Sequence, residues 1–283
     1  MRPGRSTSHA LLALLAVGLL SAAMLALPGV AGARTSRPAR APIQLAGHPG
    51  TNAGGSVTSF NWAGYAATGS TFQNAQGTWV QPAVACSAGK PQFAAFWVGL
   101  DGYLPTDNAV EQIGTDSDCV KPPKTKGKGG SKGKQLVPSY YAWFEMFPQP
   151  PVFLPTGSYP VAPGDQLTAT VSDAGGSFTL TLVDNGKWTF STQQATAMPP
   201  PASSAEWVVE SPSTCTRSCK SQPLSNFGTV AFSSVVADGA AVASQPNVAI
   251  TMVTRKKSNP VPRAVPSPLG TTGADFTVSW RSS

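Results

Sequence analysis

Short segments that alternate hydrophobic and polar residues, separated by glycine, proline, asparagine or aspartate, recur along most of this 283-residue chain. Alternation with a period of two is typical of a strand with one buried face, and no stretch has the period of an amphipathic helix. The strongest turn signal is Asn185-Gly186, which predicts a two-residue hairpin of type I′. These patterns predict an all-β protein.

The predicted strands are 61–66, 76–81, 93–100, 110–114, 140–147, 166–171, 177–184, 187–192, 205–210, 229–236, 248–253 and 275–280. The proline-rich stretches 199–201 and 259–268 are predicted loops. Many short strands with few helices predict a two-sheet antiparallel β-sandwich.

The first 33 residues have the pattern of a secretory signal peptide. Two arginines precede an apolar stretch from Ala10 to Leu27, which is followed by Pro28 and the small residues Ala31-Gly32-Ala33. The stretch has nearly the length of a membrane anchor, about 18 residues, but Pro28 and the small residues favour cleavage. We therefore expect a secreted, extracellular protein with no membrane partner after signal cleavage.

Two regions are expected after the signal peptide. Residues 34–58, rich in proline, glycine, alanine and arginine, predict a flexible linker or a short pro-segment. Residues 59–283 have the size of one β-sandwich domain. Six lysines crowd into the Lys/Gly-rich stretch 121–134. A lysine run that is interrupted by glycine and lacks aromatic residues is typical of a solvated loop, so no nucleic-acid partner is expected.

Four cysteines in an exported chain suggest disulfides, and four cysteines allow three pairings. We favour Cys86–Cys119 and Cys215–Cys219, the second of which would close a very small loop. A zinc site is a weak alternative, because the spacing is wrong and no histidine is available in the domain.

The predicted domain contains no histidine, since the chain has only His9 and His48. This excludes Ser-His-Asp and Cys-His arrangements and a zinc protease site that uses histidine ligands. Any hydrolytic chemistry must come from carboxylates, amides and hydroxyls.

Four predicted strands can each present polar or aromatic residues on one face, because alternate residues of a strand share a face. These residues are Trp97, Gly99 and Asp101 in one strand, Gln112 and Gly114 in a second, Tyr141, Trp143, Glu145 and Phe147 in a third, and Glu206, Val208 and Glu210 in a fourth. Asp116 and Asp118 are expected in a solvated turn, with a calcium site as a weak alternative.

The segments 97–102, 110–115, 141–148 and 203–210, in this order, resemble motifs of the glutamic peptidases (eqolisins). These are secreted proteases that act in acid with one glutamine and one glutamate as the catalytic pair. The resemblance runs from about Asn61 to the C-terminus. It implies two bent antiparallel sheets, like those of the concanavalin-type lectins, with a concave active face. It also implies polypeptide substrates and no metal or cofactor, and we expect a monomer.

The resemblance assigns the catalytic pair to Gln112 and Glu206. An ionised Glu206 can take a proton from water and return it to the leaving amine, while the Gln112 amide stabilises the oxyanion. A carboxylate with a pKa of about 4 stays partly ionised in acid, unlike an imidazole. Five further residues are expected to support the site or bind substrate, namely Trp97, Asp101, Tyr141, Trp143 and Glu145.

Two other functions remain open on the same fold. Glu145 and Glu206 could serve a carbohydrate-active enzyme as acid and nucleophile. The tryptophans could serve a non-catalytic, lectin-like binding module. The chain also departs from the family pattern at Glu111, directly before Gln112, where an apolar residue is usual.

Overall fold

The computed structural model describes residues 1, 44, 56–87, 89–104, 107–122, 135–196, 200–215, 219–256 and 258–283. The chain divides into two units, Met1–Ser36 and Arg37–Ser283, and all of the elements lie in the second. In the described residues the only helical element is η1 (Val242–Ser244), so the protein is all-β as predicted. The predicted signal peptide lies outside the described residues apart from Met1, as does the lysine-rich stretch beyond residue 122.

In chain order the strands are β1 (Ser56–Ser59), β2 (Trp62–Ala67), β3 (Asn74–Val80), β4 (Ala95–Leu100), β5 (Val110–Val120), β6 (Val137–Phe147), β7 (Val152–Phe153), β8 (Gln166–Asp173), β9 (Ser177–Asp184), β10 (Trp188–Ala195), β11 (Ala205–Glu210), β12 (Ser213–Cys215), β13 (Cys219–Ser221), β14 (Thr229–Ala237), β15 (Ala240–Ala241), β16 (Asn247–Val253), β17 (Pro262–Pro266) and β18 (Phe276–Trp280).

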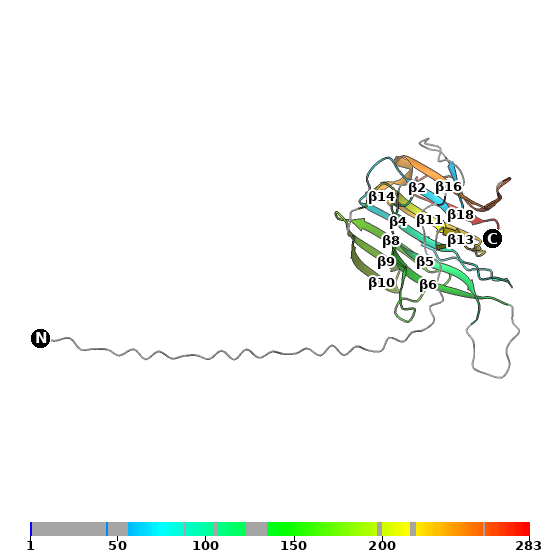
Figure 1. Ribbon diagram of the computed structural model, residues 1–283, viewed down its shortest axis with the longest axis horizontal. Helices are drawn as coiled ribbons and strands as arrows, with labels where there is room; N and C mark the ends of the chain where they lie inside the picture. Colours follow the sequence, from blue (N-terminus) through cyan, green and yellow to red (C-terminus); the bar gives the residue numbers. More distant parts are fainter. Residues whose placement is uncertain are drawn as a thin grey trace. The chain divides into compact units, whose positions relative to one another are not determined.

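One hydrogen-bonded path joins most strands in the order β10-β9-β8-β3-β14-β18-β17-β16-β2-β11-β4-β5-β6-β7. The pairs along this path are antiparallel, whereas β1 joins β16 in parallel. Figure 1 shows β8, β9 and β10 as one run of neighbouring strands and β11, β4, β5 and β6 as another. The β12–β13 pair forms a separate two-stranded sheet.

The two halves of this path pack against each other around a shared hydrophobic core. The indole N–H of Trp207 on β11 donates to the Gln76 carbonyl on β3 at 2.7 Å. A methyl group at Gly77 would lie 2.6 Å from the Trp207 ring, so only glycine permits this approach. Phe144 on β6 stacks on Phe190 of β10 with ring centroids 5.9 Å apart. The predicted two-sheet sandwich is therefore confirmed.

Three local predictions were wrong, and the first two concern segments that form strands instead of turns or loops. Asp116 and Asp118 do not lie in a solvated turn, because β5 continues through them to Val120 and both side chains are buried. The predicted proline-rich loop contains strand β17, whose two prolines lie at its ends, where a missing N–H disturbs a ladder least. Between them, Arg263 and Ala264 are buried.

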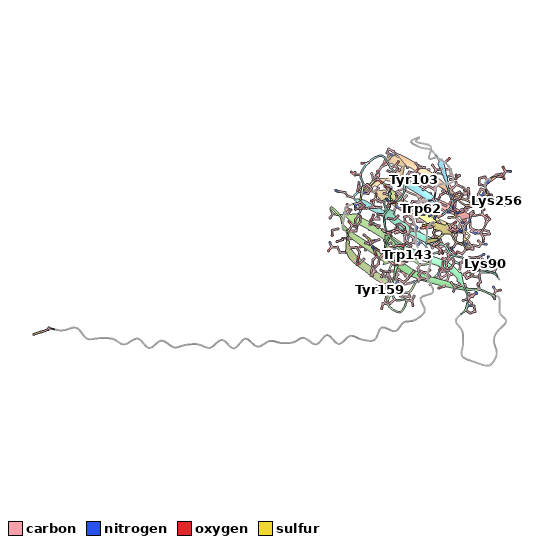
Figure 2. All side chains as sticks on the ribbon, in the orientation of Figure 1. Trp62, Lys90, Tyr103, Trp143, Tyr159 and Lys256 are labelled. Atoms are coloured by element: carbon pink, nitrogen blue, oxygen red, sulfur yellow. A yellow bond between two sulfur atoms is a disulfide. The ribbon has the colours of Figure 1, made fainter. Side chains whose placement is uncertain are left out.

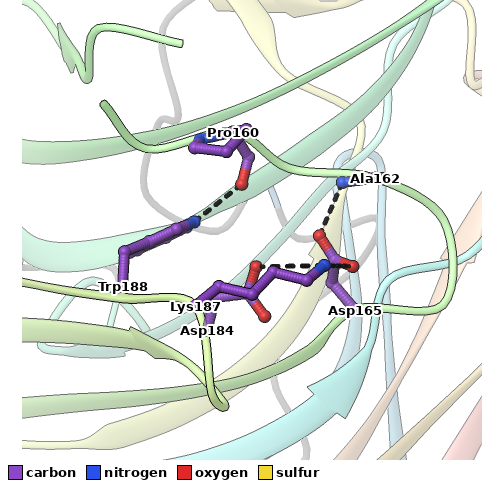
Figure 3. Close-up of polar contacts among 6 residues, drawn as sticks. All are labelled: Pro160, Ala162, Asp165, Asp184, Lys187 and Trp188. Atoms are coloured by element: carbon purple, nitrogen blue, oxygen red, sulfur yellow. Dashed lines mark hydrogen bonds and ion pairs between the residues drawn. The ribbon is translucent and has the colours of Figure 1, made fainter. Parts of the chain in front are cut away.

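The hairpin between β9 and β10 is present, but its turn is not of type I′. The N–H of Lys187 donates to the Asp184 carbonyl at 3.0 Å, and only Gly186 of the connecting residues has a positive φ, 79°. A positive φ at the third residue of the turn is what a type II turn requires. The Lys187 ammonium lies between the carboxylates of Asp165 and Asp184, and Trp188 donates to the Pro160 carbonyl at 2.7 Å (Figure 3).

The predicted Cys86–Cys119 disulfide is confirmed, with a Cα–Cα distance of 5.4 Å. For Cys215–Cys219 the backbone register places the two residues opposite each other, but the Cys215 side chain lies outside the described residues, so this pairing stays a prediction. None of the described helical structure is long and apolar enough to cross a membrane.

Candidate active site

Gln112, Glu145 and Glu206 lie in one row across four neighbouring strands. In the register, Glu206 on β11 is opposite Gly99 on β4, Gly99 is opposite Gln112 on β5, and Gln112 is opposite Glu145 on β6. Residues that are opposite each other point to the same face, so these side chains share one face of the sheet. Gly99 contributes no side chain between Gln112 and Glu206. Two strand spacings separate their backbones by about 10 Å, so both side chains can reach one bound group.

The next row of this face is aromatic. It runs from Val208 through Trp97 and Gly114 to Trp143 and then to Phe153 on β7. Gly114 leaves the position between the two tryptophans without a side chain. The Trp97 ring also meets Trp62 edge to face at 4.9 Å. Both Trp62 and Trp143 lie among the strands of the body and are fully buried (Figure 2).

Carboxylates hold both tryptophans by their indole N–H groups. Trp97 donates to Glu210 at 3.1 Å, and Trp143 donates to Asp116 at 2.6 Å. The hydroxyl of Tyr141 lies 2.9 Å from Asp116 and 2.5 Å from Asp118. The predicted residues Trp97, Tyr141 and Trp143 therefore share the face with the Gln112–Glu206 row.

Glu206 is fully buried, and neither of its carboxyl oxygens has a hydrogen-bond partner in the described part of the chain. Burial raises the pKa of Glu206 well above its ordinary value. The nearby hydroxyl of Ser204 partly offsets this shift and lowers the pKa of Glu206. The two side chains do not reach the geometry of a full hydrogen bond. The negative charges of Asp101 and Asp107 add to the rise. In this environment Glu206 holds a proton at pH values at which an exposed glutamate is ionised.

Asp101 lies just beyond the end of β4 and leaves the face that its alternation predicted. Its φ of 65° is unusual for a residue other than glycine. This conformation turns its carboxylate toward the turn before β11, where it accepts the N–H groups of Ala202 at 3.1 Å and Ser203 at 2.7 Å. Burial raises its pKa. Asp101 contacts the backbone that leads to Glu206, and its supporting role stays a prediction.

Glu111 points away from the row, like its neighbour Ile113 in the core. It is 1% exposed, and its Oε2 atom has no hydrogen-bond partner in the described residues. Burial, with the charge of Asp101 as the next cause, raises the pKa of Glu111 to about 9. It is therefore a neutral carboxylic acid within the sandwich at acid and neutral pH.

Sequence reasoning missed several residues of this region. Asp116 continues the alternation of Gln112 and Gly114 along β5, so that pattern could have found it. Asp107 and Ser203 lie in turns, where no periodic signal exists. Among the described residues, no cluster of three or more histidine, cysteine, aspartate or glutamate side chains could hold a metal ion.

Comparison with solved structures shows the same fold in two proteases. Scytalido-glutamic peptidase, solved with a transition-state analog inhibitor, is 22% identical, with a TM-score of 0.59. SCP-B, a member of the eqolisin family solved with the tripeptide Ala-Ile-His, is 21% identical, with a TM-score of 0.55. Each match covers 78% of this chain and 98% of the solved chain. No curated protein sequence matches the chain.

The β-sandwich fold is that of these two glutamic peptidases. The model of the Peptidase A4 family matches residues 60–279. The chain belongs to this family and is a peptidase. Its substrates are accordingly polypeptides.

Proposed function

We propose that this protein is a secreted endopeptidase that acts in acid, with Glu206 and Gln112 as its catalytic pair. The observation that carries the proposal is the row in which Gly99 lies between the two residues and leaves room above the sheet. Secretion is supported by the Cys86–Cys119 disulfide, which is typical of exported proteins, and by the predicted signal peptide.

In the proposed reaction, ionised Glu206 takes a proton from a water molecule as the water oxygen attacks the peptide carbonyl carbon. The carbonyl electrons move to oxygen, and the amide N–H of Gln112 stabilises the resulting oxyanion. Glu206 then returns its proton to the amine nitrogen as the C–N bond breaks. Trp97 and Trp143, which Glu210 and Asp116 hold in place, provide an apolar surface for substrate side chains.

The site must open before a polypeptide can reach it, because Gln112, Glu145 and Glu206 have no solvent exposure in the full-length chain. We infer that residues 34–58 are a pro-segment rather than a linker. Gln44, in this segment, donates its N–H to Asn61 at 2.7 Å and its side-chain amide to Ser213 at 2.7 Å. Its carbonyl accepts the N–H of Phe60 at 2.7 Å.

Opening also changes the chemistry of Glu206. Its raised pKa comes first from burial, so contact with water returns the pKa toward the ordinary value of about 4. In the closed chain Glu206 is therefore protonated and cannot act as a base. In the open chain Glu206 is partly ionised in acid and can act as a base.

A glycosidase mechanism fits this geometry poorly. Glu145 and Glu206 lie three strand spacings apart, about 14 Å between backbones. Paired glycosidase carboxyl groups lie about 5 to 9.5 Å apart, so the two glutamate side chains would have to lean toward each other over Gln112 and Gly99 to form such a pair.

Glu206→Gln tests the proposal because it removes the base with little change in volume. We expect no measurable cleavage of a denatured protein substrate at acid pH, with the circular dichroism spectrum unchanged. Asp238→Asn, at an exposed carboxylate, is the control and should cleave like the wild type. More than a tenth of wild-type turnover in Glu206→Gln, or activity on a β-glucan panel instead of protein, would contradict the proposal.

A further inference from the structure

Two turns are joined next to Glu206. One follows β4 and begins at Asp101, and the other leads into β11 through Ser203 and Ser204. The N–H of Asp101 donates to the Ser204 carbonyl at 3.0 Å. The position of the second turn sets where β11 enters the sheet, since this strand begins at Ala205.

Asp107 lies at the centre of this junction and is 7% exposed. Its Oδ2 atom accepts the N–H of Gly102 at 3.2 Å and the N–H of Leu104 at 3.1 Å, which folds the first turn around the carboxylate. The same oxygen accepts the hydroxyl of Ser203 at 2.8 Å. One carboxylate thus connects the turn after β4 with the turn before β11.

Ser203 is held from two sides. Its N–H donates to Asp101 at 2.7 Å, and its hydroxyl lies 2.8 Å from Asp107 and 3.2 Å from Asp101. A hydroxyl has one hydrogen to donate, and the shorter contact directs it to Asp107. Gly102 must be glycine here, because a methyl group would lie 2.4 Å from Val110 and its φ is 94°.

We propose that Asp107 is a positioning residue for Glu206 and that Asp107 acts through Ser203. The inference rests on the proposed catalytic role of Glu206. Only Ser204 and Ala205 separate Ser203 from Glu206, and β11 pairs directly with β4, which precedes the first turn. A shift of one residue in this register would turn Glu206 to the opposite face of the sheet. By joining the two turns, Asp107 holds Glu206 opposite Gly99.

The negative charge of Asp107 provides a second, separable effect. It contributes to the raised pKa of Glu206, so its removal must lower that pKa. The charge of Asp107 therefore shifts the pH profile, whereas the hydroxyl of Ser203 affects the position of Glu206 alone.

The test compares Ser203→Ala, Ser203→Thr, Asp107→Asn and Glu206→Gln in the full chain, with kcat and KM measured across pH and folding checked by thermal unfolding. We expect Ser203→Ala to lower kcat about tenfold, because small errors of position are costly in catalysis, and to change KM little. Ser203→Thr keeps the hydroxyl and should recover most of the loss. Asp107→Asn should lower kcat and also move the acid limb of kcat/KM to lower pH.

Wild-type kcat and an unchanged pH profile in both Ser203→Ala and Asp107→Asn would overturn the inference, provided that Glu206→Gln is inactive. If Asp107→Asn does not fold, the comparison of Ser203→Ala with Ser203→Thr decides the outcome, and equal kcat values would refute the positioning role. An active Glu206→Gln variant would instead refute the proposed function itself.

Discussion

Glu206 lies directly opposite Gly99 in the antiparallel register of β11 and β4. Gln112 flanks the same glycine from β5. Only a residue without a side chain at position 99 leaves the space between these two groups open. A methyl group there would lie 2.9 Å from the Trp97 ring and 3.2 Å from the Cβ of Gln112.

Gly99→Ala should therefore lower activity, although Gly99 is buried. The added methyl displaces Gln112 or Trp97, and a displacement of about 1 Å can cost about 10²-fold in rate. The measurement is kcat/KM on a peptide at acid pH. Gly157→Ala is the matched control, because a methyl group there meets nothing within 4 Å. Equal kcat/KM in both variants would show that the space above Gly99 is not used.

Gln112→Ala should lower kcat by about 10²–10³-fold, the usual cost of one oxyanion donor. KM should change much less, since the oxyanion exists only in the transition state. Steady-state kinetics on a small peptide separate the two constants. A rise in KM with an unchanged kcat would make Gln112 a substrate-binding residue instead.

Glu111 should make the protein less stable as the pH rises. Its ordinary pKa of 4.5 is raised to about 9 in the folded chain, so between these values the folded state holds a proton that the unfolded state releases. The contribution of this bound proton to the free energy of unfolding is complete below about pH 4.5. Above that pH it falls by about 1.4 kcal/mol per pH unit. The midpoint temperature of thermal unfolding should accordingly drop between pH 5 and pH 8.

Glu111→Gln cannot ionise and should make this pH dependence shallower, with the remainder due to Glu206, whose pKa is also raised. The buried amide of the variant lowers stability at pH 4 by about 1–3 kcal/mol. Asp238→Asn, at an exposed carboxylate, should retain the wild-type slope. A Glu111→Gln variant whose midpoint falls as steeply as that of the wild type would assign the pH dependence to other groups.

Local alternation predicted much of the sandwich, and the bounds of β9 and β11 agree with the predicted segments 177–184 and 205–210. It could not predict the row through Gly99, because β11 enters the sheet between β2 and β4, and this order depends on contacts distant in sequence. Asp116 was missed because a carboxylate is ordinarily exposed. Here Trp143 and Tyr141 supply the hydrogen bonds that allow its burial.

Gln44→Ala should weaken the closed form of the full-length chain. Its side chain contacts Ser213, at 2.7 Å, and Arg255. Each such hydrogen bond contributes about 0.5–1.5 kcal/mol net. The loss of both, about 1–3 kcal/mol, should raise the population of the open form about 5- to 140-fold, since 1.4 kcal/mol corresponds to a factor of ten. In progress curves at acid pH, the variant should show a shorter lag before peptide cleavage than the wild type. Gln135→Ala, at an exposed glutamine that contacts the Cys86 carbonyl, is the control. Identical progress curves without a lag in all three proteins would identify residues 34–58 as a linker.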